Sequence, residues 1–260
     1  DDDLKQLVNT DGSIEQIYEA LAIKDITLAT DTLRGVYDST NGKDGYVSLE
    51  VSPVLAYKTE KTVAAAKRLF QTVNRPNVMI KVPATAAGLP AITELIGCGV
   101  NVNVTLIFGL ENYKSVAAAY QAGLEKLAES GPAVAGGHPI NKVASVASFF
   151  VSRVDTAVDK ELEAIGNREL TGKIAIANSK MAYAEYQRIL QQPRWQELAA
   201  KGARPQRVLW ASTSTKNLHT WLLEVLGNSR KPVMARLFVP CSIECTLCLK
   251  IHLSFRFLVA

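Results

Sequence analysis

The amino-acid sequence predicts an α/β fold of the TIM-barrel type, in which parallel strands surround a shared interior. The first observation is that strand patterns alternate with helical patterns along the chain, which is typical of parallel βα units. The second is that five of the strand patterns carry polar residues at alternate positions. Because alternate side chains of a strand point to opposite faces, five such strands indicate one polar interior. With 260 residues, 48% of them hydrophobic, the chain is long enough to bury the core of one such domain.

The first half of the chain begins with the pattern of a helical capping box, Ser13-Ile14-Glu15-Gln16. Periodicity then predicts these elements in order: a helix from Ile14 to about Leu21, a second helical pattern from about Ile23 to Tyr37, a loop over 41–45, an alternating strand over 47–52, an alanine-rich helix capped by Thr59 and ending near Val73, and a strand over 78–85 that contains Lys81.

The second half continues the alternation. It predicts a short helix from Leu89 to Ile96, a strand over 101–108, a helix from Leu110 to about Glu129, a loop over 131–139, a strand over 144–153, helices near Asp155–Ile165 and Ala175–Leu190, and a last strand over 207–214. The alternate polar positions are Ser48, Glu50 and Ser52; Lys81; Asn101, Asn103 and Thr105; Ser148 and Ser152; and Ser212 and Ser214. An alternative is that some of these side chains face solvent on a poorly covered sheet.

Lys81 lies in the apolar run Val78-Met79-Ile80-Lys81-Val82, where a bare ammonium group is costly to bury. Its side chain must therefore either reach water from an edge strand or be held in a polar pocket. In a pocket, burial favours the neutral amine, which is the form that attacks a carbonyl carbon.

The predicted interior combines one lysine with Glu50, Asn103 and Thr105, a set that suits a Schiff-base site. Lys81 would attack a ketose carbonyl, and the iminium would draw electrons from the adjacent C–C bond. Glu50 is the carboxylate available in these strands to move protons, directly or through a water held by Thr105. Asn103 would bind a substrate hydroxyl. No cofactor or metal is required, and His138, His219 and His252 form no ligand pair with these strands.

At these residues the chain resembles the transaldolases, specifically their longer transaldolase-like branch. The resemblance runs from about Asp11 to Asn217. It rests on five segments in the family's order: Val47-Ser48-Leu49-Glu50-Val51-Ser52, Met79-Ile80-Lys81-Val82-Pro83-Ala84-Thr85, Asn101-Val102-Asn103-Val104-Thr105-Leu106, Ser148-Phe149-Phe150-Val151-Ser152-Arg153 and Trp210-Ala211-Ser212-Thr213-Ser214.

The resemblance implies a (β/α)8 TIM barrel and a role for each site residue. Lys81 is implied to be the Schiff-base lysine, while Glu50 and Thr105 manage a catalytic water. Asn103 is implied to contact the dihydroxyacetone part of the substrate. Ser148 and Arg153 match positions that bind this part and the phosphate, for which an arginine fork is suited. The alternative for Arg153 is a salt bridge with Asp155 or Asp159.

The resemblance also implies an incomplete barrel. Two strands of the family, one with a catalytic aspartate, precede the position that matches Asp1, and the final βα unit is not recognisable after Asn217. Three of eight strands are therefore expected to be missing, and we predict a partial barrel domain over 1–217 and an atypical tail over 218–260. The tail holds three of the four cysteines, a composition shift that indicates a changed reading frame or an alternative splice product.

The tail also carries the C-x3-C-x2-C spacing of radical-SAM iron–sulfur enzymes at Cys241, Cys245 and Cys248. Too few residues follow for the barrel that such enzymes need, so iron–sulfur chemistry is rejected. With His252 the three cysteines make a possible zinc set, and the alternative is a fortuitous cluster.

The net charge of +4 suits anionic metabolites and is too mild to predict nucleic-acid binding. No apolar run is long enough to cross a membrane. The first residues, Asp1 to Asp3, are neither a signal peptide nor a translation start. The first 240 residues contain one cysteine, Cys98, and so low a cysteine content is typical of proteins in a reduced compartment. The resemblance permits the cytoplasm, or a plastid if a transit peptide preceded residue 1, and a homo-oligomer.

Three functions remain open from the sequence. The first is a transaldolase of the pentose phosphate pathway, moving a dihydroxyacetone unit among fructose 6-phosphate, sedoheptulose 7-phosphate, erythrose 4-phosphate and glyceraldehyde 3-phosphate. The second is a Schiff-base aldolase of the fructose-6-phosphate type, which releases the unit to water. The third is a non-catalytic, truncated product.

Overall fold

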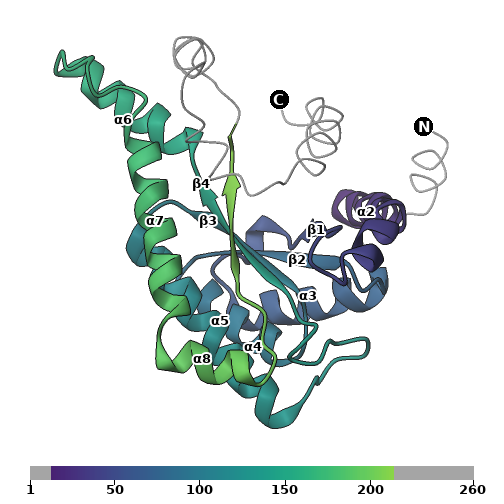
Figure 1. Cartoon of the computed structure of the whole chain (residues 1–260). Coiled ribbons are helices and arrows are strands. Elements are labelled where there is room, and N and C mark those ends of the chain that lie inside the picture. Colours follow the sequence, from purple (N-terminus) through teal and green to yellow (C-terminus); the bar gives the residue numbers. More distant parts are fainter. Residues whose placement is uncertain (1–12, 214–260) are drawn as a thin grey trace. The chain divides into compact units, whose positions relative to one another are not determined.

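The structure is a computed structural model that describes residues 13–213. These residues lie in the first of the two units into which the chain divides, Asp1–Ser214 and Thr215–Ala260. The predicted tail and its Cys241-to-His252 set lie outside the described residues. The elements alternate along the chain (Figure 1) in this order: α2 (Ile14–Ser39), β1 (Val47–Glu50), the 3-10 turn η1 (Pro53–Leu55), α3 (Thr59–Val73), β2 (Val78–Pro83), α4 (Gly88–Gly97), β3 (Val102–Ile107), α5 (Leu110–Ser130), β4 (Ser145–Phe150), α6 (Ser152–Ala164), α7 (Ile174–Leu190), α8 (Pro193–Ala200) and β5 (Arg207–Ala211).

The five described strands form one sheet in the order β1-β2-β3-β4-β5. Every neighbouring pair is parallel, and helices connect each strand to the next. Consecutive order and parallel pairing throughout are the arrangement of a TIM barrel. The predicted α/β class and barrel type are therefore confirmed, with five strands in the described part of the chain.

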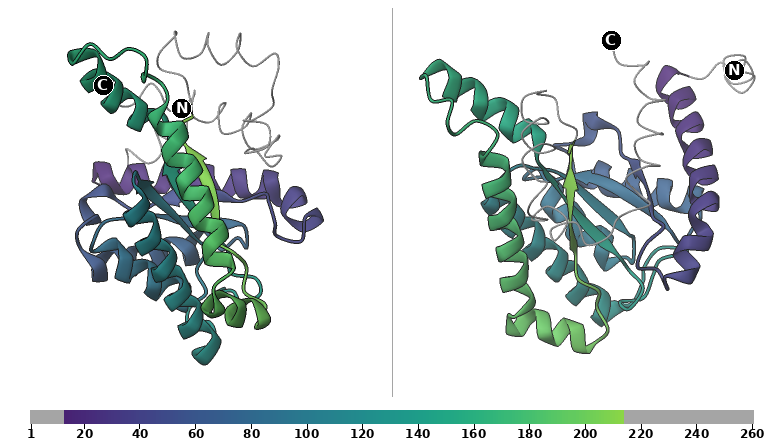
Figure 2. Two further views of the ribbon diagram at one scale, coloured as in Figure 1. Left: turned by 60° about the vertical axis from the view of Figure 1, so that its left-hand side comes forward. Right: turned by 45° about the horizontal axis from the view of Figure 1, so that its top comes forward.

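The two faces of the sheet have different surroundings. On one face, the side chains of Leu49, Ile80, Val102 and Ala147 are buried in a large apolar core beneath the helices. The helices contribute, among others, Leu69 of α3, Ile92 of α4, Leu124 of α5, Ala182 of α7 and Leu198 of α8. Two further views show α5, α7 and α8 grouped beside the β4 and β5 end of the sheet (Figure 2). The opposite parity of each strand forms the inner face, which carries five of the six predicted site residues: Glu50, Lys81, Asn103, Thr105 and Ser148.

The sheet curves around its inner face. Met79 of β2 and Val146 of β4 belong to one small buried cluster. Tyr46, the residue before β1, and Leu209 of β5 pack against this cluster. Side chains from strands so far apart in the sheet meet only if the sheet is bent. In addition, Arg204, just before β5, donates from Nη1 to the carbonyl oxygen of Gly42, just before β1, at 2.8 Å. The amino ends of the first and last described strands are therefore tied together.

The helix predictions need three corrections. The expected helices of residues 14–21 and 23–37 are one helix, α2, of 26 residues, because no breaker separates the two patterns; its capping box is present. Thr59 does not cap α3. Lys58 occupies the N-cap position and makes no side-chain cap, and the hydroxyl of Thr59 instead donates to the carbonyl oxygen of Ala87 at 2.7 Å. Helix α8 was not predicted, although Pro193 in its first turn is a typical helix start.

Strand β3 departs from the predicted alternation near its carboxyl end. The pairing of β3 with β4 shifts between Val104 and Ile107, and Leu106 has a φ of 62°. This bulge inserts one residue, so that Leu106 is 41% exposed and Ile107 is buried in the helix-covered core. Without the bulge, simple alternation would put Ile107 on the inner face with Thr105.

Gly88, at the start of α4, is required by a close approach of the backbone, and Gly35 in α2 is not. A Cβ at Gly88 would lie 2.0 Å from the carbonyl oxygen of Pro83, whereas one at Gly35 would meet nothing within 4 Å. We expect Gly88→Ala to destabilise the chain by about 2 kcal/mol or more through this clash. The control Gly35→Ala should stabilise it by about 0.5–1 kcal/mol, since alanine loses less backbone entropy in a helix. Urea unfolding followed by tryptophan fluorescence measures both, and equal midpoints for the two variants would contradict this prediction.

Candidate active site

Lys81 lies in β2, which is hydrogen-bonded to β1 on one side and to β3 on the other. The alternative of a lysine on an edge strand is therefore wrong. Its neighbours Ile80 and Val82 point into the apolar core, so Lys81 itself lies on the inner face. The side chain is 26% exposed, and its ammonium group forms an ion pair with the carboxylate of Glu50.

The parallel register of β1 and β2 explains this pair. Glu50, the last residue of β1, lies directly opposite Lys81 in the ladder, and both belong to the inner parity of their strands. The side chain of Glu50 is 63% exposed, so that water screens the pair and we expect it to stabilise the fold by about 1 kcal/mol or less. The carboxylate therefore stays accessible to a ligand and to water while it is held beside the amine.

Asn103 and Ser148 form a row with Ser48 across the inner face. The hydroxyl of Ser148 donates to Oδ1 of Asn103 at 2.7 Å, and Nδ2 of Asn103 donates to the hydroxyl of Ser48 at 2.9 Å. Asn103 and Ser148 are both buried. Because Asn103 is opposite Lys81 in the ladder of β2 and β3, this row passes next to the lysine. Ser48 was predicted to face the interior but was given no role.

Thr105 is the last inner residue of β3 before the bulge. It is buried, and its carbonyl oxygen accepts a hydrogen bond from the backbone N–H of Ala84 at 2.8 Å. Its hydroxyl makes no hydrogen bond to any other group of residues 13–213. The hydroxyl is therefore available for a water or a ligand at the carboxyl end of the strands.

Arg153 does not lie in a strand, which corrects the prediction of a strand over 144–153. Strand β4 ends at Phe150, and Arg153 is in the first turn of α6. Its guanidinium group lies over the Phe150 ring, 5.2 Å from the ring centre, and the ring of Phe108 lies 5.0 Å from that of Phe150. The exposed Arg153 makes no hydrogen bond or ion pair with the other five predicted site residues.

The alternative role of Arg153 as a partner of Asp155 or Asp159 is not what the structure shows. Asp155 accepts a hydrogen bond from the backbone N–H of Ala175, and Asp159 accepts one from Gly172, both at 2.9 Å. These carboxylates thus hold α6 to the start of α7. Burial raises the pKa of Asp155, and the hydrogen bond from Ala175 opposes this shift. Arg153 has no acidic partner among the described residues and presents its charge at the carboxyl end of β4.

Asn101 shows that inner parity alone does not identify a site residue. Its Nδ2 donates to the carbonyl oxygens of Pro76 and Val78, and its Oδ1 accepts from the backbone N–H of Ala144. The amide therefore joins backbone on both sides of β3 at the amino end of the sheet, opposite to the end where Thr105 lies. Asn101 has a structural role.

Thr85 joins the loops that follow Glu50 and Lys81. Its hydroxyl donates to the carbonyl oxygen of Ala56 at 2.5 Å and accepts from the backbone N–H of Gly88 at 2.9 Å. The loop after β1 and the turn after β2 are thus held to each other. This arrangement limits how far the two strand ends that carry Glu50 and Lys81 can separate.

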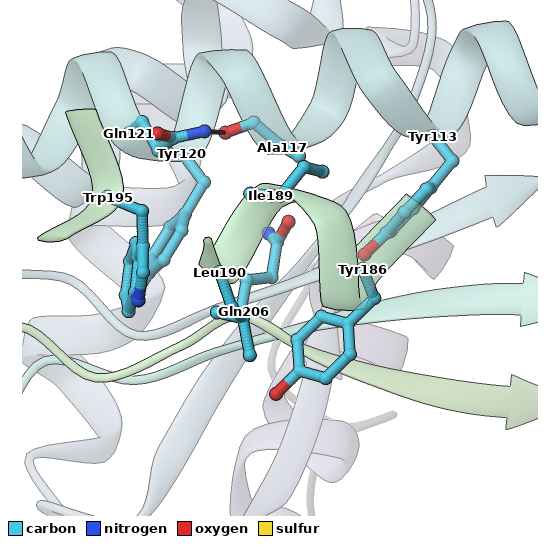
Figure 3. A pocket seen from close by; sticks show the side chains of 9 residues that line it. All are labelled: Tyr113, Ala117, Tyr120, Gln121, Tyr186, Ile189, Leu190, Trp195 and Gln206. Carbon is cyan, nitrogen blue, oxygen red and sulfur yellow. Dashed lines mark hydrogen bonds between the residues drawn. The ribbon is translucent and has the colours of Figure 1, made fainter. Parts of the chain in front are cut away.

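A small pocket of the described chain lies away from these residues, on the helix-covered side of the sheet (Figure 3). It is lined by residues of α5, α7 and α8 and by Gln206, and none of the predicted site residues contributes to it.

Residues 13–213 contain no group of three histidine, cysteine or acidic side chains arranged to hold a metal ion. In the same range no helix has both the length and the apolar composition needed to span a membrane.

The different roles of Asn101 and Glu50 predict effects of different size on stability. Asn101→Ala leaves the N–H of Ala144 and two carbonyl oxygens without their partner, and we expect a loss of at least about 2 kcal/mol in the free energy of unfolding. Glu50→Gln removes only a water-screened ion pair and should change the free energy of unfolding by about 1 kcal/mol or less. Urea denaturation of both variants tests this, and a larger loss for Glu50→Gln than for Asn101→Ala would overturn the assignment.

Comparison with known proteins shows which proteins the sequence of this chain resembles. The family model described as Transaldolase/Fructose-6-phosphate aldolase matches residues 1–227, a wider span than the Asp11–Asn217 on which the sequence resemblance rests. The transaldolase of Saccharopolyspora erythraea is 50% identical over 218 residues, which cover 84% of this chain and 57% of that protein. The transaldolase of Frankia alni is 52% identical over 207 residues, 78% of this chain and 54% of that protein. That of Trichodesmium erythraeum is 46% identical over 228 residues, 84% and 58% of the two chains.

The chain thus spans somewhat more than half the length of the curated relatives that it matches. The predicted domain boundary at residue 217 stays a prediction. The match covers most of the chain and includes the strands that carry Glu50, Lys81, Asn103 and Ser148. On this evidence the chain belongs to the transaldolase/fructose-6-phosphate aldolase family.

Proposed function

We propose that this chain carries the Schiff-base site of a transaldolase, which transfers a dihydroxyacetone unit from a ketose phosphate to an aldose phosphate. The observation that carries the proposal is the ion pair of Lys81 with Glu50, on the same face as Asn103, Thr105 and Ser148. An amine beside a carboxylate, inside a row of hydroxyl and amide groups, suits covalent chemistry on a polyhydroxylated carbonyl compound.

In the proposed reaction, Nζ of Lys81 attacks the C2 carbonyl carbon of the ketose, and loss of one water gives an iminium ion. The iminium accepts the electron pair of the C3–C4 bond, while the proton of the C4 hydroxyl passes to a base and an aldose phosphate leaves. The resulting enamine then attacks the aldehyde carbon of a second aldose phosphate. This attack forms a new C–C bond and an iminium ion, and the base returns its proton to the former aldehyde oxygen. Hydrolysis of the new iminium then restores the amine of Lys81.

Glu50 is the proposed carrier of these protons, because it is the carboxylate that contacts Lys81 and it is open to water. The hydroxyl of Thr105, which has no hydrogen-bond partner among residues 13–213, is proposed to bind the water through which protons pass. Asn103 and Ser148 are proposed to bind hydroxyls of the three-carbon unit. Arg153 is proposed to bind the phosphate, since its guanidinium has no acidic partner in the described part of the chain.

An aldolase that releases the three-carbon unit to water is the second candidate, because the matched family covers both activities. The names of the relatives support transfer instead, since they are transaldolases. The proposed substrates are fructose 6-phosphate and sedoheptulose 7-phosphate as donors, with glyceraldehyde 3-phosphate and erythrose 4-phosphate as acceptors.

Borohydride reduction tests the covalent step. Incubation of the chain with fructose 6-phosphate and borohydride should attach a reduced, sugar-derived adduct to the peptide that contains Lys81, as measured by peptide mass spectrometry. Lys81→Arg should abolish the adduct, because a guanidinium stays protonated and does not act as the nucleophile. Glu50→Gln should slow its formation by about 10²-fold or more and still allow it, since the amine is kept.

Lys67→Arg is the matched control. Lys67 is also ion-paired to a glutamate, Glu94, but it lies in α3 on the outer side of the sheet, so this variant should form the adduct like the original chain. An adduct on a different lysine, or undiminished adduct in the Lys81→Arg variant, would refute the proposed function.

A further inference from the structure

Ser48 is the inner residue of β1 that precedes Glu50, and its hydroxyl accepts a hydrogen bond from Nδ2 of Asn103 at 2.9 Å. The two residues belong to different strands, β1 and β3, with β2 between them. Barrel interiors have this geometry, because the side chains of one interior layer come from alternate strands. The hydrogen bond therefore crosses β2 on its inner face, where Lys81 is the residue opposite Asn103.

The amide of Asn103 is held at both of its ends. Ser148 donates to its Oδ1, and its Nδ2 donates to Ser48. Asn103 is 6% exposed and Ser148 is 2% exposed, so little water reaches this row. If Ser48 were absent, the Nδ2 group would lose its described partner in a buried place, where an unpaired donor is costly. The amide of Asn103 would then turn toward another acceptor. Its second N–H and its remaining lone pair would lose the fixed orientation in which they can meet a ligand.

A second consequence concerns Ser148. Its single hydroxyl proton is used in the bond to Asn103, so its oxygen can only accept a hydrogen bond from a ligand. The row from Ser148 through Asn103 to Ser48 thus presents one acceptor at Ser148 and, at Asn103, one N–H that has no partner among the described residues. This pairing suits a ligand with two neighbouring hydroxyl groups, of which one donates and the other accepts.

We propose that Ser48 is a positioning residue of the ketose site: by accepting from Asn103 it holds the amide in the orientation that binds a substrate hydroxyl. Ser48 itself is not assigned a contact with the reacting atoms. The inference rests on the proposed function for the identity of the ligand. It predicts that Ser48 matters for ketones that carry hydroxyl groups and does not matter for the reactivity of Lys81 itself.

The first measurement does not depend on the reaction. In the full chain labelled with 15N-asparagine, the side-chain NH2 signal of Asn103, assigned with the Asn103→Asp variant, should show one proton that exchanges slowly with water. Ser48→Ala should remove this protection, and Ser48→Thr, which keeps the hydroxyl, should retain it. Ser145→Ala is the control, because Ser145 is a buried, hydrogen-bonded serine of β4 with the opposite parity, and this variant should leave the signal unchanged.

The second measurement compares borohydride trapping at Lys81 with dihydroxyacetone and with acetone, which lacks hydroxyl groups. Ser48→Ala should reduce the dihydroxyacetone adduct by up to about tenfold, the value of one neutral hydrogen bond, and leave the acetone adduct unchanged. Ser48→Thr should trap dihydroxyacetone like the original chain, and Ser145→Ala should do the same.

The outcomes separate the two proposals. If the original chain forms no adduct with fructose 6-phosphate, dihydroxyacetone or acetone, the proposed function fails, and the role of Ser48 in ketose binding fails with it. If the original chain forms both ketone adducts and Ser48→Ala traps dihydroxyacetone undiminished, the role of Ser48 alone is refuted. An equal loss of both adducts in Ser48→Ala, or an unchanged Asn103 signal, also refutes it.

Discussion

The candidate site depends on the parallel register of β1, β2 and β3. This register puts Glu50 opposite Lys81 and Lys81 opposite Asn103, all with their side chains on one face. A shift of one residue in either ladder would send one member of the set to the helix-covered core. The register is fixed strongly, because Leu49, Ile80 and Val102 are buried on the other face of the same strands. The apolar core therefore determines where the polar groups meet.

The two faces of the sheet divide stability and chemistry between them. The free energy of folding comes mainly from the helix-covered face, where the strands bury branched aliphatic side chains against α3, α4, α5, α7 and α8. The inner face carries groups that contribute little to folding, such as the screened pair of Lys81 and Glu50. Asn101 and the cluster around Met79 are the exceptions, and both lie toward the amino end of the inner face. This division is the one expected of barrels, in which the carboxyl end of the strands holds the functional groups.

Much of this arrangement follows from sequence patterns, because strand alternation assigns a face to each residue. It placed Glu50, Lys81, Asn103 and Ser148 together, and the structure joins them in pairs. It failed where the backbone leaves regular geometry. The left-handed φ of Leu106 carries no signal in the sequence, since leucine seldom adopts it. The predicted strand was also too long: β4 ends at Phe150, and Arg153 belongs to the helix that follows it. Alternation also cannot separate Asn101 from Asn103: they share a parity, and only the position of each along the strand decides whether its amide meets backbone or a ligand.

The most direct measurement on the central claim is a crystal structure of the chain after borohydride reduction in the presence of fructose 6-phosphate. We expect continuous electron density from Nζ of Lys81 to the C2 atom of the sugar-derived unit. The hydroxyl groups of this unit should lie within hydrogen-bond distance of Asn103 and Ser148, with Glu50 beside the new C–N bond. Density for the adduct on another lysine, or a unit bound to Lys81 that points away from Asn103 and Ser148, would contradict the assignment of this face as the active site.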